Sequence, residues 1–185
     1  MEYSETTENR STTNSIELLV HRWKTPLYTL CYRLTRKQEE ADDLFQETWI
    51  RIMEKIDQHK SDCEFLPWAK TICINLFRDR CRVLNRISAV FTSFSTHEQY
   101  NYHYENAADT YHSTDDDLDK DALQKCMRRL SPLLRGVLVL SYYEDYSYEE
   151  IANVLHIPQG TVKSRINRAK EMLKKYMEDF YEKNS

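Results

Sequence analysis

The chain contains very little glycine and proline for its length. Its 185 residues include two glycines and four prolines, and no Asn-Gly or Asp-Gly pair separates alternating apolar segments. Because tight β-hairpins depend on such pairs, their absence argues against a protein built from hairpins. Apolar residues recur instead at helical spacing. The sequence therefore predicts an all-α protein.

The chain also lacks a long apolar run. No segment approaches the roughly 18 to 20 apolar residues that a membrane-spanning helix requires. The first residues, MEYSETTENRSTTN, are polar and do not resemble a secretory signal peptide. The sequence predicts a cytoplasmic protein without direct membrane insertion.

Cysteine pairs and catalytic constellations are missing as well. The five cysteines form no C-x-x-C pair and have no histidine at zinc-finger spacing. No nucleophile with a neighbouring base, no metal cluster and no glycine-rich phosphate loop is apparent. We therefore expect no enzyme, no metal, no cofactor and no small-molecule substrate. Small buried thiols are expected at Cys31, Cys63, Cys73, Cys81 and Cys126.

What the chain does contain is most distinctive in residues 147–175, where two helix starts flank a short turn. Ser147 and Glu150 have the spacing of a capping box, in which each side chain bonds the other residue's backbone amide. Pro158 ends the first apolar run, because proline lacks an amide proton and disfavours helix at the preceding residue. This arrangement is typical of a helix-turn-helix. The second helix is predicted from about residue 159, with a buried stripe of Val162, Ile166, Ala169 and Leu173.

The other faces of that second helix are polar and basic. Arginine and lysine on a major-groove helix donate to guanine or neutralise phosphates, and a helix N-terminus favours a phosphate. A basic face on an isolated helix is usually only solvated, but the paired helices and the tight turn favour DNA binding here. The polar positions are Gly160, Thr161, Lys163, Ser164, Arg165, Asn167, Arg168 and Lys170.

Composition divides the chain into two helical blocks and a flexible acidic linker. Residues 94–121 have almost no aliphatic side chains, show no helical or strand periodicity and end in an acidic cluster. We predict an N-terminal helical bundle over 15–90, the linker over 91–121 and a helix-turn-helix domain over 122–181. The formal net charge of -4 is unusual for a free-standing DNA-binding protein, but basic residues cluster on both sides of the linker. Two separate DNA contacts are therefore predicted.

The first block has the pattern of several helices. Two short helices are predicted on either side of Pro26, over about 16–23 and 27–34. The next helix has acidic residues in its first turn, which suit the helix dipole, although a solvated helix start explains them equally well. Over 65–84 aromatic residues alternate with cations, a pattern that can bind unpaired bases but is more often core. The apolar face of the acidic helix is predicted from Ala41, Leu44, Phe45, Thr48, Trp49, Ile52, Met53 and Ile56.

These residues resemble the extracytoplasmic-function (ECF) group of bacterial RNA polymerase sigma factors. Ala41 to Arg51 is similar to the family's A-E-D-L-V-Q-E-T-F-x-R segment, and Phe65 to Arg82 is similar to F-x-x-W-L-x-x-I-x-x-N-x-x-x-D-x-x-R. Leu130 to Leu138 resembles L-P-x-x-x-R-x-V-L, and residues 147–165 resemble S-Y-E-E-I-A-x-x-L-x-I-P-x-G-T-V-K-S-R. His156 departs from this pattern, since it stands where the family usually has glycine. The four segments occur in the family's order, which makes the resemblance specific.

The resemblance implies a subunit that binds core RNA polymerase, through the β′ clamp helices and the β subunit, and directs it to the promoters of an alternative or stress-responsive gene set. The implied polymerase contacts are Asp42, Asp43, Leu44, Gln46, Glu47, Trp49 and Arg51. The implied contacts with the promoter's minus-ten element are Trp68, Asn75, Arg78, Asp79 and Arg82. The implied contacts with the minus-thirty-five element are Gly160, Thr161, Lys163, Ser164, Arg165 and Arg168.

The resemblance further implies a cognate anti-sigma factor, often membrane-bound, which would hold the chain at the membrane. It also implies that the linker lies along the RNA exit channel of the polymerase. Two other functions are compatible with the residues alone. One is a two-domain helix-turn-helix regulator that acts without recruiting polymerase, and the other is a protein-interaction module whose basic helices bind acidic partners.

Overall fold

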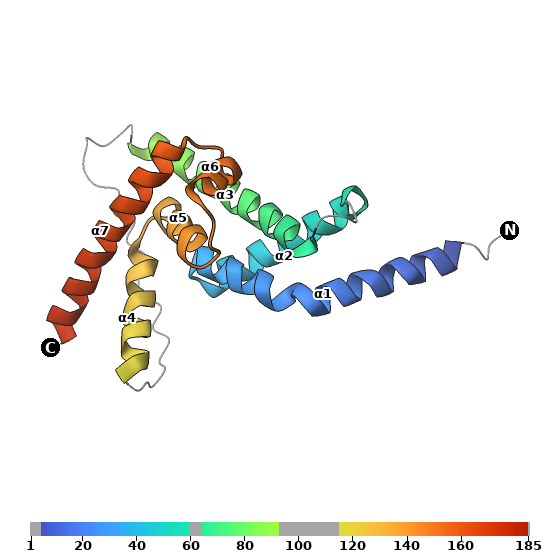
Figure 1. Ribbon diagram of the computed structural model, residues 1–185, viewed down its shortest axis with the longest axis horizontal. Coiled ribbons are helices and arrows are strands. Elements are labelled where there is room, and N and C mark those ends of the chain that lie inside the picture. The colour runs from blue at the N-terminus through green and yellow to red at the C-terminus, as the bar shows by residue number, and fades with distance from the viewer. Residues whose placement is uncertain (1–4, 60–63, 93–114, 185) are drawn as a thin grey trace.

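The computed structural model describes residues 5–59, 64–92 and 115–184 and contains only helices over these ranges (Figure 1). The prediction of an all-α fold is confirmed. The helices are α1 (Glu5–Thr35), α2 (Gln38–Lys55), α3 (Phe65–Thr92), α4 (Asp115–Arg129), α5 (Pro132–Tyr142), α6 (Tyr148–Leu155) and α7 (Gln159–Asn184), with the short 3-10 helix η1 (Ile56–Gln58) after α2.

The N-terminal half is a bundle of α1, α2 and α3. An apolar cluster between these helices contains Leu27, Trp49, Ile52, Ala69 and Ile72, with partly buried aromatic rings around it. The rings pack edge to face or stacked, as aromatic side chains do in protein cores. Most aromatic residues of this half therefore support the fold.

The break predicted at Pro26 is wrong, because α1 is one continuous helix with Pro26 inside it. A proline in a helix interior removes one backbone hydrogen bond and strains the preceding turn. Apolar residues on both sides of it are packed into the two cores, from Val20 and Trp23 before it to Leu30 and Leu34 after it. Burial of this continuous face offsets the local cost of the proline.

The C-terminal half comprises α4 to α7. Helix α7 packs against α4, α5 and α6, and Figure 1 shows α4 and α7 side by side. The stripe predicted on α7 is confirmed for Val162, Ile166 and Ala169, which have no solvent exposure, and Leu173 is partly buried against the same core.

The acidic cluster at 115–121 is helical, contrary to the absence of helical structure expected there. Acidic residues at a helix start interact favourably with the dipole, and the apolar residues that follow, Ala122 and Cys126, are buried. The rest of the predicted linker, 93–114, lies outside the described residues.

The two halves share one core. Leu30 and Leu34 of α1 and Ile74 and Phe77 of α3 belong to the same buried cluster as Val137 of α5 and residues of α6 and α7. The guanidinium of Arg135 on α5 is buried and donates a hydrogen bond to the Leu34 carbonyl at 2.7 Å. The halves are therefore packed closely together.

Candidate polymerase and promoter interfaces

The helix-turn-helix is formed by α6 and α7, as predicted. The Ser147 hydroxyl accepts a hydrogen bond from the Glu150 amide at 3.2 Å, and the Glu150 carboxylate accepts one from the Ser147 amide at 2.8 Å. These bonds complete the predicted capping box. Hydrogen bonds from the Ser147 hydroxyl and amide lower the pKa of the Glu150 carboxyl. His156 ends α6 in the left-handed conformation, with a φ of 51°.

Several side chains predicted to contact DNA lie exposed on the first turns of α7. Lys163 and Arg168 are exposed and Thr161 is half-buried. Apart from its chain neighbours and its own helix backbone, nothing lies within 4 Å of where a Cβ at position 160 would stand. The Ser164 hydroxyl is exposed and donates to the Thr161 carbonyl at 3.0 Å. The Thr161 amide is not available for a phosphate, because it donates to the Pro158 carbonyl at 2.9 Å. Its hydroxyl remains a candidate donor.

Arg165 differs from the exposed cations of α7. Its side chain is partly buried, and this burial lowers the pKa of its guanidinium. The guanidinium lies within electrostatic range of the Cys81 thiol on α3, whose own burial raises its pKa to about 12. One of the predicted base-reading residues therefore faces the N-terminal half in this conformation.

The residues of α3 predicted to contact the minus-ten element form a hydrogen-bonded group. Arg78 donates to the Asn75 amide oxygen at 2.8 Å and pairs with the Asp79 carboxylate at 2.9 Å. Arg82 lies 3.6 Å from the same carboxylate. Asp79 therefore pairs with both neighbouring arginines. Trp68 is half-buried, and its ring centre lies 4.7 Å from that of His59.

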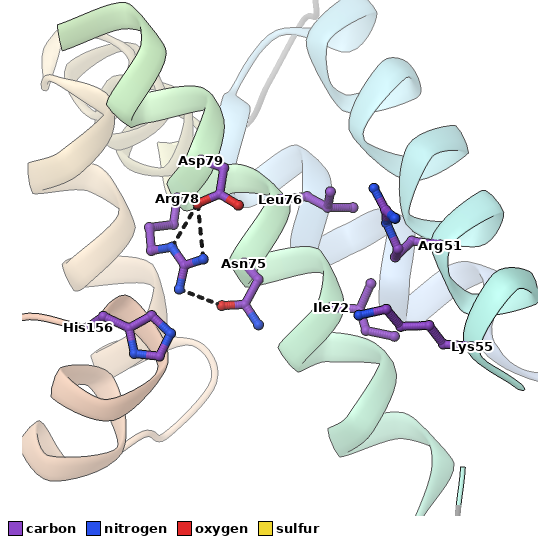
Figure 2. A pocket seen from close by; sticks show the side chains of 8 residues that line it. All are labelled: Arg51, Lys55, Ile72, Asn75, Leu76, Arg78, Asp79 and His156. Carbon is purple, nitrogen blue, oxygen red and sulfur yellow. Dashed lines mark hydrogen bonds and ion pairs between the residues drawn. The ribbon is translucent and has the colours of Figure 1, made fainter. Parts of the chain in front are cut away.

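Asn75, Arg78 and Asp79 line a cavity together with residues from two other helices (Figure 2). Arg51 and Lys55 of α2 lie on one side of α3 and His156 at the end of α6 lies on the other. The cavity is rich in cations, and the acid that lines it, Asp79, is already paired with arginine. Such a lining suits an anion better than an apolar ligand.

The acidic helix α2 presents a mixed exposed face. Asp43 and Gln46 are exposed, and Arg51 is exposed and pairs with Glu54 at 2.9 Å. Asp42 accepts a hydrogen bond from the Tyr28 hydroxyl at 2.7 Å, and Glu47 pairs with Arg80 at 2.7 Å. Leu44 and Trp49 are buried, so in this conformation they hold the helix in place and do not face a partner.

Two apolar residues of α2 are unexpectedly exposed. Ile50 is 55% exposed and Met53 is 46% exposed, although Met53 was predicted on the buried face. At helical spacing, positions 43, 46, 50 and 53 lie along one side of α2. An exposed apolar pair beside polar residues is typical of an interaction surface. The buried stripe of α2 runs through positions 41, 44, 48 and 52 and leaves position 50 outside it. Helical spacing alone could therefore have predicted from the sequence that Ile50 is exposed.

Comparison with known proteins agrees with this arrangement. Sigma-70 region 2 matches residues 19–87, and Sigma-70, region 4 matches residues 120–173. The ECF RNA polymerase sigma factor SigW of Bacillus subtilis (strain 168) is 32% identical over 164 residues, covering 87% of this chain and 88% of SigW. The chain belongs to the ECF group of RNA polymerase sigma factors. A sigma factor directs RNA polymerase to promoters and is not itself an enzyme.

Further relatives of this sigma factor are consistent with that assignment. The ECF RNA polymerase sigma factor SigE of Mycolicibacterium smegmatis (strain ATCC 700084 / mc(2)155) is 35% identical over 159 residues, covering 86% of this chain and 60% of SigE. Both halves of the chain match, which an ordinary helix-turn-helix regulator does not explain. The regulator alternative is therefore not favoured.

Solved structures share the fold of this sigma factor. The sigma factor RpoE of Bartonella quintana, in complex with the anti-sigma factor NepR, has a TM-score of 0.58 at 24% identity, covering 89% of this chain and 97% of RpoE. CnrH, in complex with the cytosolic domain of CnrY, has a TM-score of 0.55 at 21% identity, covering 90% of each chain. None of the helices within the described ranges could span a membrane.

Proposed function

We propose that this sigma factor divides its work between the two halves. Residues 15–90 bind core polymerase and the minus-ten element, and residues 122–181 bind the minus-thirty-five element. The linker at 91–121 limits the distance between the two DNA sites that the halves can bind at once. The promoters served belong to an alternative or stress-responsive gene set.

The upstream contact is proposed from the exposed first turns of α7. The observation that carries this proposal is the set of exposed donors, Lys163, Ser164 and Arg168, within two turns of a helix whose opposite side is buried. Such a helix can lie in the major groove with cations toward base edges and phosphates. Thr161 and Gly160 at its start are placed to approach a phosphate, and Arg165 joins the contact if the halves separate.

The downstream contact is proposed from α3. Asn75, Arg78 and Arg82 offer amide and guanidinium donors, Asp79 orients the two arginines, and Trp68 offers a partly exposed ring near the start of the helix. Donors and aromatic faces in this combination suit unpaired bases and the backbone beside them. In the structure Arg78 is partly covered by the C-terminal half, because its guanidinium donates to the Val154 carbonyl of α6 at 3.3 Å.

Polymerase binding is proposed from the exposed side of α2. Asp43 and Gln46 supply polar contacts, and Ile50 and Met53 supply apolar area in the middle of the same side. Asp42, Glu47 and Arg51 lie at its edges, already paired within the chain, while Leu44 and Trp49 support the helix from the core. The expected partner surface is the β′ clamp helices, with additional contacts to the β subunit.

We further propose that a cognate anti-sigma factor holds this chain inactive and that the chain works in the cytoplasm. The two solved structures of similar fold are both complexes, one of the sigma factor RpoE with the anti-sigma factor NepR and one of CnrH with the cytosolic domain of CnrY. A membrane-bound inhibitor would keep the chain at the membrane without any insertion of its own.

The direct test is to add the purified chain to core RNA polymerase with a library of promoter fragments and to sequence the transcript starts. Starts downstream of a shared two-part motif are expected. Lys163→Ala should alter or weaken selection of the upstream element alone, by about tenfold in use of the best sequences. Lys183→Ala removes the same charge near the far end of α7 and serves as the control. If the chain gives no stimulation of specific starts, the proposal is wrong.

A further inference from the structure

Lys170 is an exposed cation on α7 whose charge is not used to hold the fold together. Within the described ranges, it forms no ion pair with a carboxylate. It lies on the same side of α7 as Lys163, because positions 163, 167 and 170 are neighbours at helical spacing. Lys174, one turn further on, differs from it, since its ammonium pairs with Glu178 at 3.8 Å. The charge of Lys170 is therefore available to an external anion.

The Lys170 side chain is held by an aromatic ring from a different helix. Its ammonium nitrogen lies 5.0 Å from the centre of the Tyr142 ring at the end of α5. A cation at this distance is attracted to the face of the ring. The interaction with Tyr142 raises the pKa of Lys170, and Tyr148 at the start of α6 has a smaller effect in the same direction. The ammonium is therefore charged at neutral pH and restricted in position.

The Tyr142 ring has a firm support but is not itself part of the core. It is 54% exposed, whereas the residues of α5 just before it, from Val137 to Leu140, are buried. Helix α5 packs against α7, which fixes the two helices relative to each other. The Tyr143 amide donates to the Val139 carbonyl at 3.0 Å and so continues the helical bonding past Tyr142. Replacing the ring should leave the core intact.

The position of Lys170 along α7 suits a phosphate better than a base. At a rise of 1.5 Å per residue, it lies about 10 Å further along the helix than Lys163. The major groove is about 12 Å wide. When Lys163 reaches base edges inside the groove, Lys170 therefore lies close to the sugar-phosphate backbone at the edge of the groove. Contacts of this kind fix the orientation of the protein and carry no sequence information.

We propose that Tyr142 positions the Lys170 ammonium to bind a backbone phosphate at the edge of the minus-thirty-five element. This inference rests on the proposed function, which places the first turns of α7 in the major groove. An exposed lysine loses conformational freedom when it binds an anion. The ring lowers this cost, because it holds the ammonium near its bound position before DNA arrives. Tyr142 is thus a positioning residue, through which α5 takes part in promoter binding.

A double-mutant cycle tests the coupling between the two side chains. Tyr142→Leu removes the ring and its hydroxyl but keeps an apolar side chain, and Lys170→Ala removes the cation. The two single variants, the double variant and wild type are each assembled with core polymerase. Tyr181→Leu is the matched control, because Tyr181 is also exposed, at 43%, and lies near the far end of α7. Circular dichroism and thermal unfolding establish that each chain is folded.

The measurement is the affinity of each holoenzyme for a fluorescent promoter duplex over a series of salt concentrations. Lys170→Ala should weaken binding about fivefold and make the slope of log affinity against log salt shallower by about one. Tyr142→Leu should weaken binding about threefold and also make this slope shallower. The double variant should bind as Lys170→Ala does, whereas independent contributions would weaken binding about fifteenfold. Tyr181→Leu should match wild type.

A second duplex with an altered minus-thirty-five sequence separates a phosphate contact from base reading. Lys170→Ala should weaken binding to both duplexes by the same factor, because a phosphate contact is independent of sequence.

The inference is overturned if Tyr142→Leu weakens binding equally with and without Lys170, or if neither single variant changes the salt slope. A wild-type holoenzyme that shows no preference for the minus-thirty-five sequence would instead contradict the proposed function. The two failures are therefore distinguishable.

Discussion

At the scale of single residues, His156 has a strained backbone conformation that its φ angle identifies. It ends α6 with a φ of 51°, where a side chain with a Cβ is disfavoured and glycine is not. The backbone bonds there are nevertheless made, since the His156 amide donates to the Asn153 carbonyl and the Ile157 amide donates to the Ala152 carbonyl. The turn therefore forms its backbone hydrogen bonds, but the strained conformation of His156 lowers the stability of the protein.

His156→Gly should therefore stabilise the protein by about 1 kcal/mol. The free energy of unfolding in urea measures the effect. His156→Ala keeps the Cβ and should give no comparable gain. A glycine variant no more stable than wild type would show that the imidazole, which lines the cavity beside α3, contributes as much as the strain costs.

At the scale of one element, the capping box determines where α6 begins. Ser147→Ala should lower the free energy of unfolding by about 1 kcal/mol at neutral pH. Since the folded-state pKa of Glu150 is lowered, the contribution of this carboxylate is present above its unfolded pKa and is lost as the pH falls through its folded pKa. The difference between Ser147→Ala and wild type should accordingly shrink in acid.

Urea unfolding at neutral and acidic pH tests this prediction. Ser164→Ala, which removes a hydroxyl bonded to a carbonyl within α7, is the control and should change stability by less than about 0.5 kcal/mol. A Ser147→Ala effect that is independent of pH would show that the carboxylate does not take part in the cap.

A second element, α2, gives a prediction about polymerase. Ile50→Asp should weaken binding of the chain to core polymerase by at least about tenfold, because it places a charge in the middle of the proposed apolar contact. Leu18→Asp, at an exposed leucine on α1, is the matched control. Surface-immobilised core polymerase and a titration of each variant provide the measurement. If both variants lose the same affinity for core polymerase, the result would argue against a specific polymerase-binding surface on α2.

Helices α2, α6 and α7 show what the sequence pattern alone can predict. Local rules of capping, proline chemistry and helical spacing predict both ends of α6, the start of α7 and the buried stripe of α7. In α2 the period identifies the buried side correctly at Leu44 and Ile52 but misplaces Met53, which is half-exposed. Position 53 lies at the edge of the stripe, where neighbouring helices and not periodicity determine burial.

At the scale of the whole molecule, net charge and packing both oppose DNA binding by the free chain. The chain carries a formal net charge of -4, and Arg78 and Arg165 are partly engaged between the halves. Polymerase would hold the two DNA-binding faces at promoter spacing, so that two weak contacts combine through effective concentration. The free chain should bind a promoter duplex at least about a hundredfold more weakly than the holoenzyme does.

An electrophoretic mobility-shift titration at one salt concentration, with and without core polymerase, measures this ratio. The holoenzyme formed with Lys183→Ala should bind as the wild-type holoenzyme does. Tight and sequence-specific binding by the free chain would contradict the prediction. It would favour a helix-turn-helix regulator that acts without recruiting polymerase.

The sequence by itself determined the helical fold, the helix-turn-helix and the family, because capping, helical periodicity and ordered motifs act within short stretches of chain. The candidate contacts that it names lie on α2, α3 and α7. Only the tertiary structure decided that α1 continues through Pro26, that Met53 faces outward, and that Glu144 joins Arg33 and Lys70. Each of these depends on residues brought together from distant parts of the chain, and such contacts leave no periodic signal in the sequence.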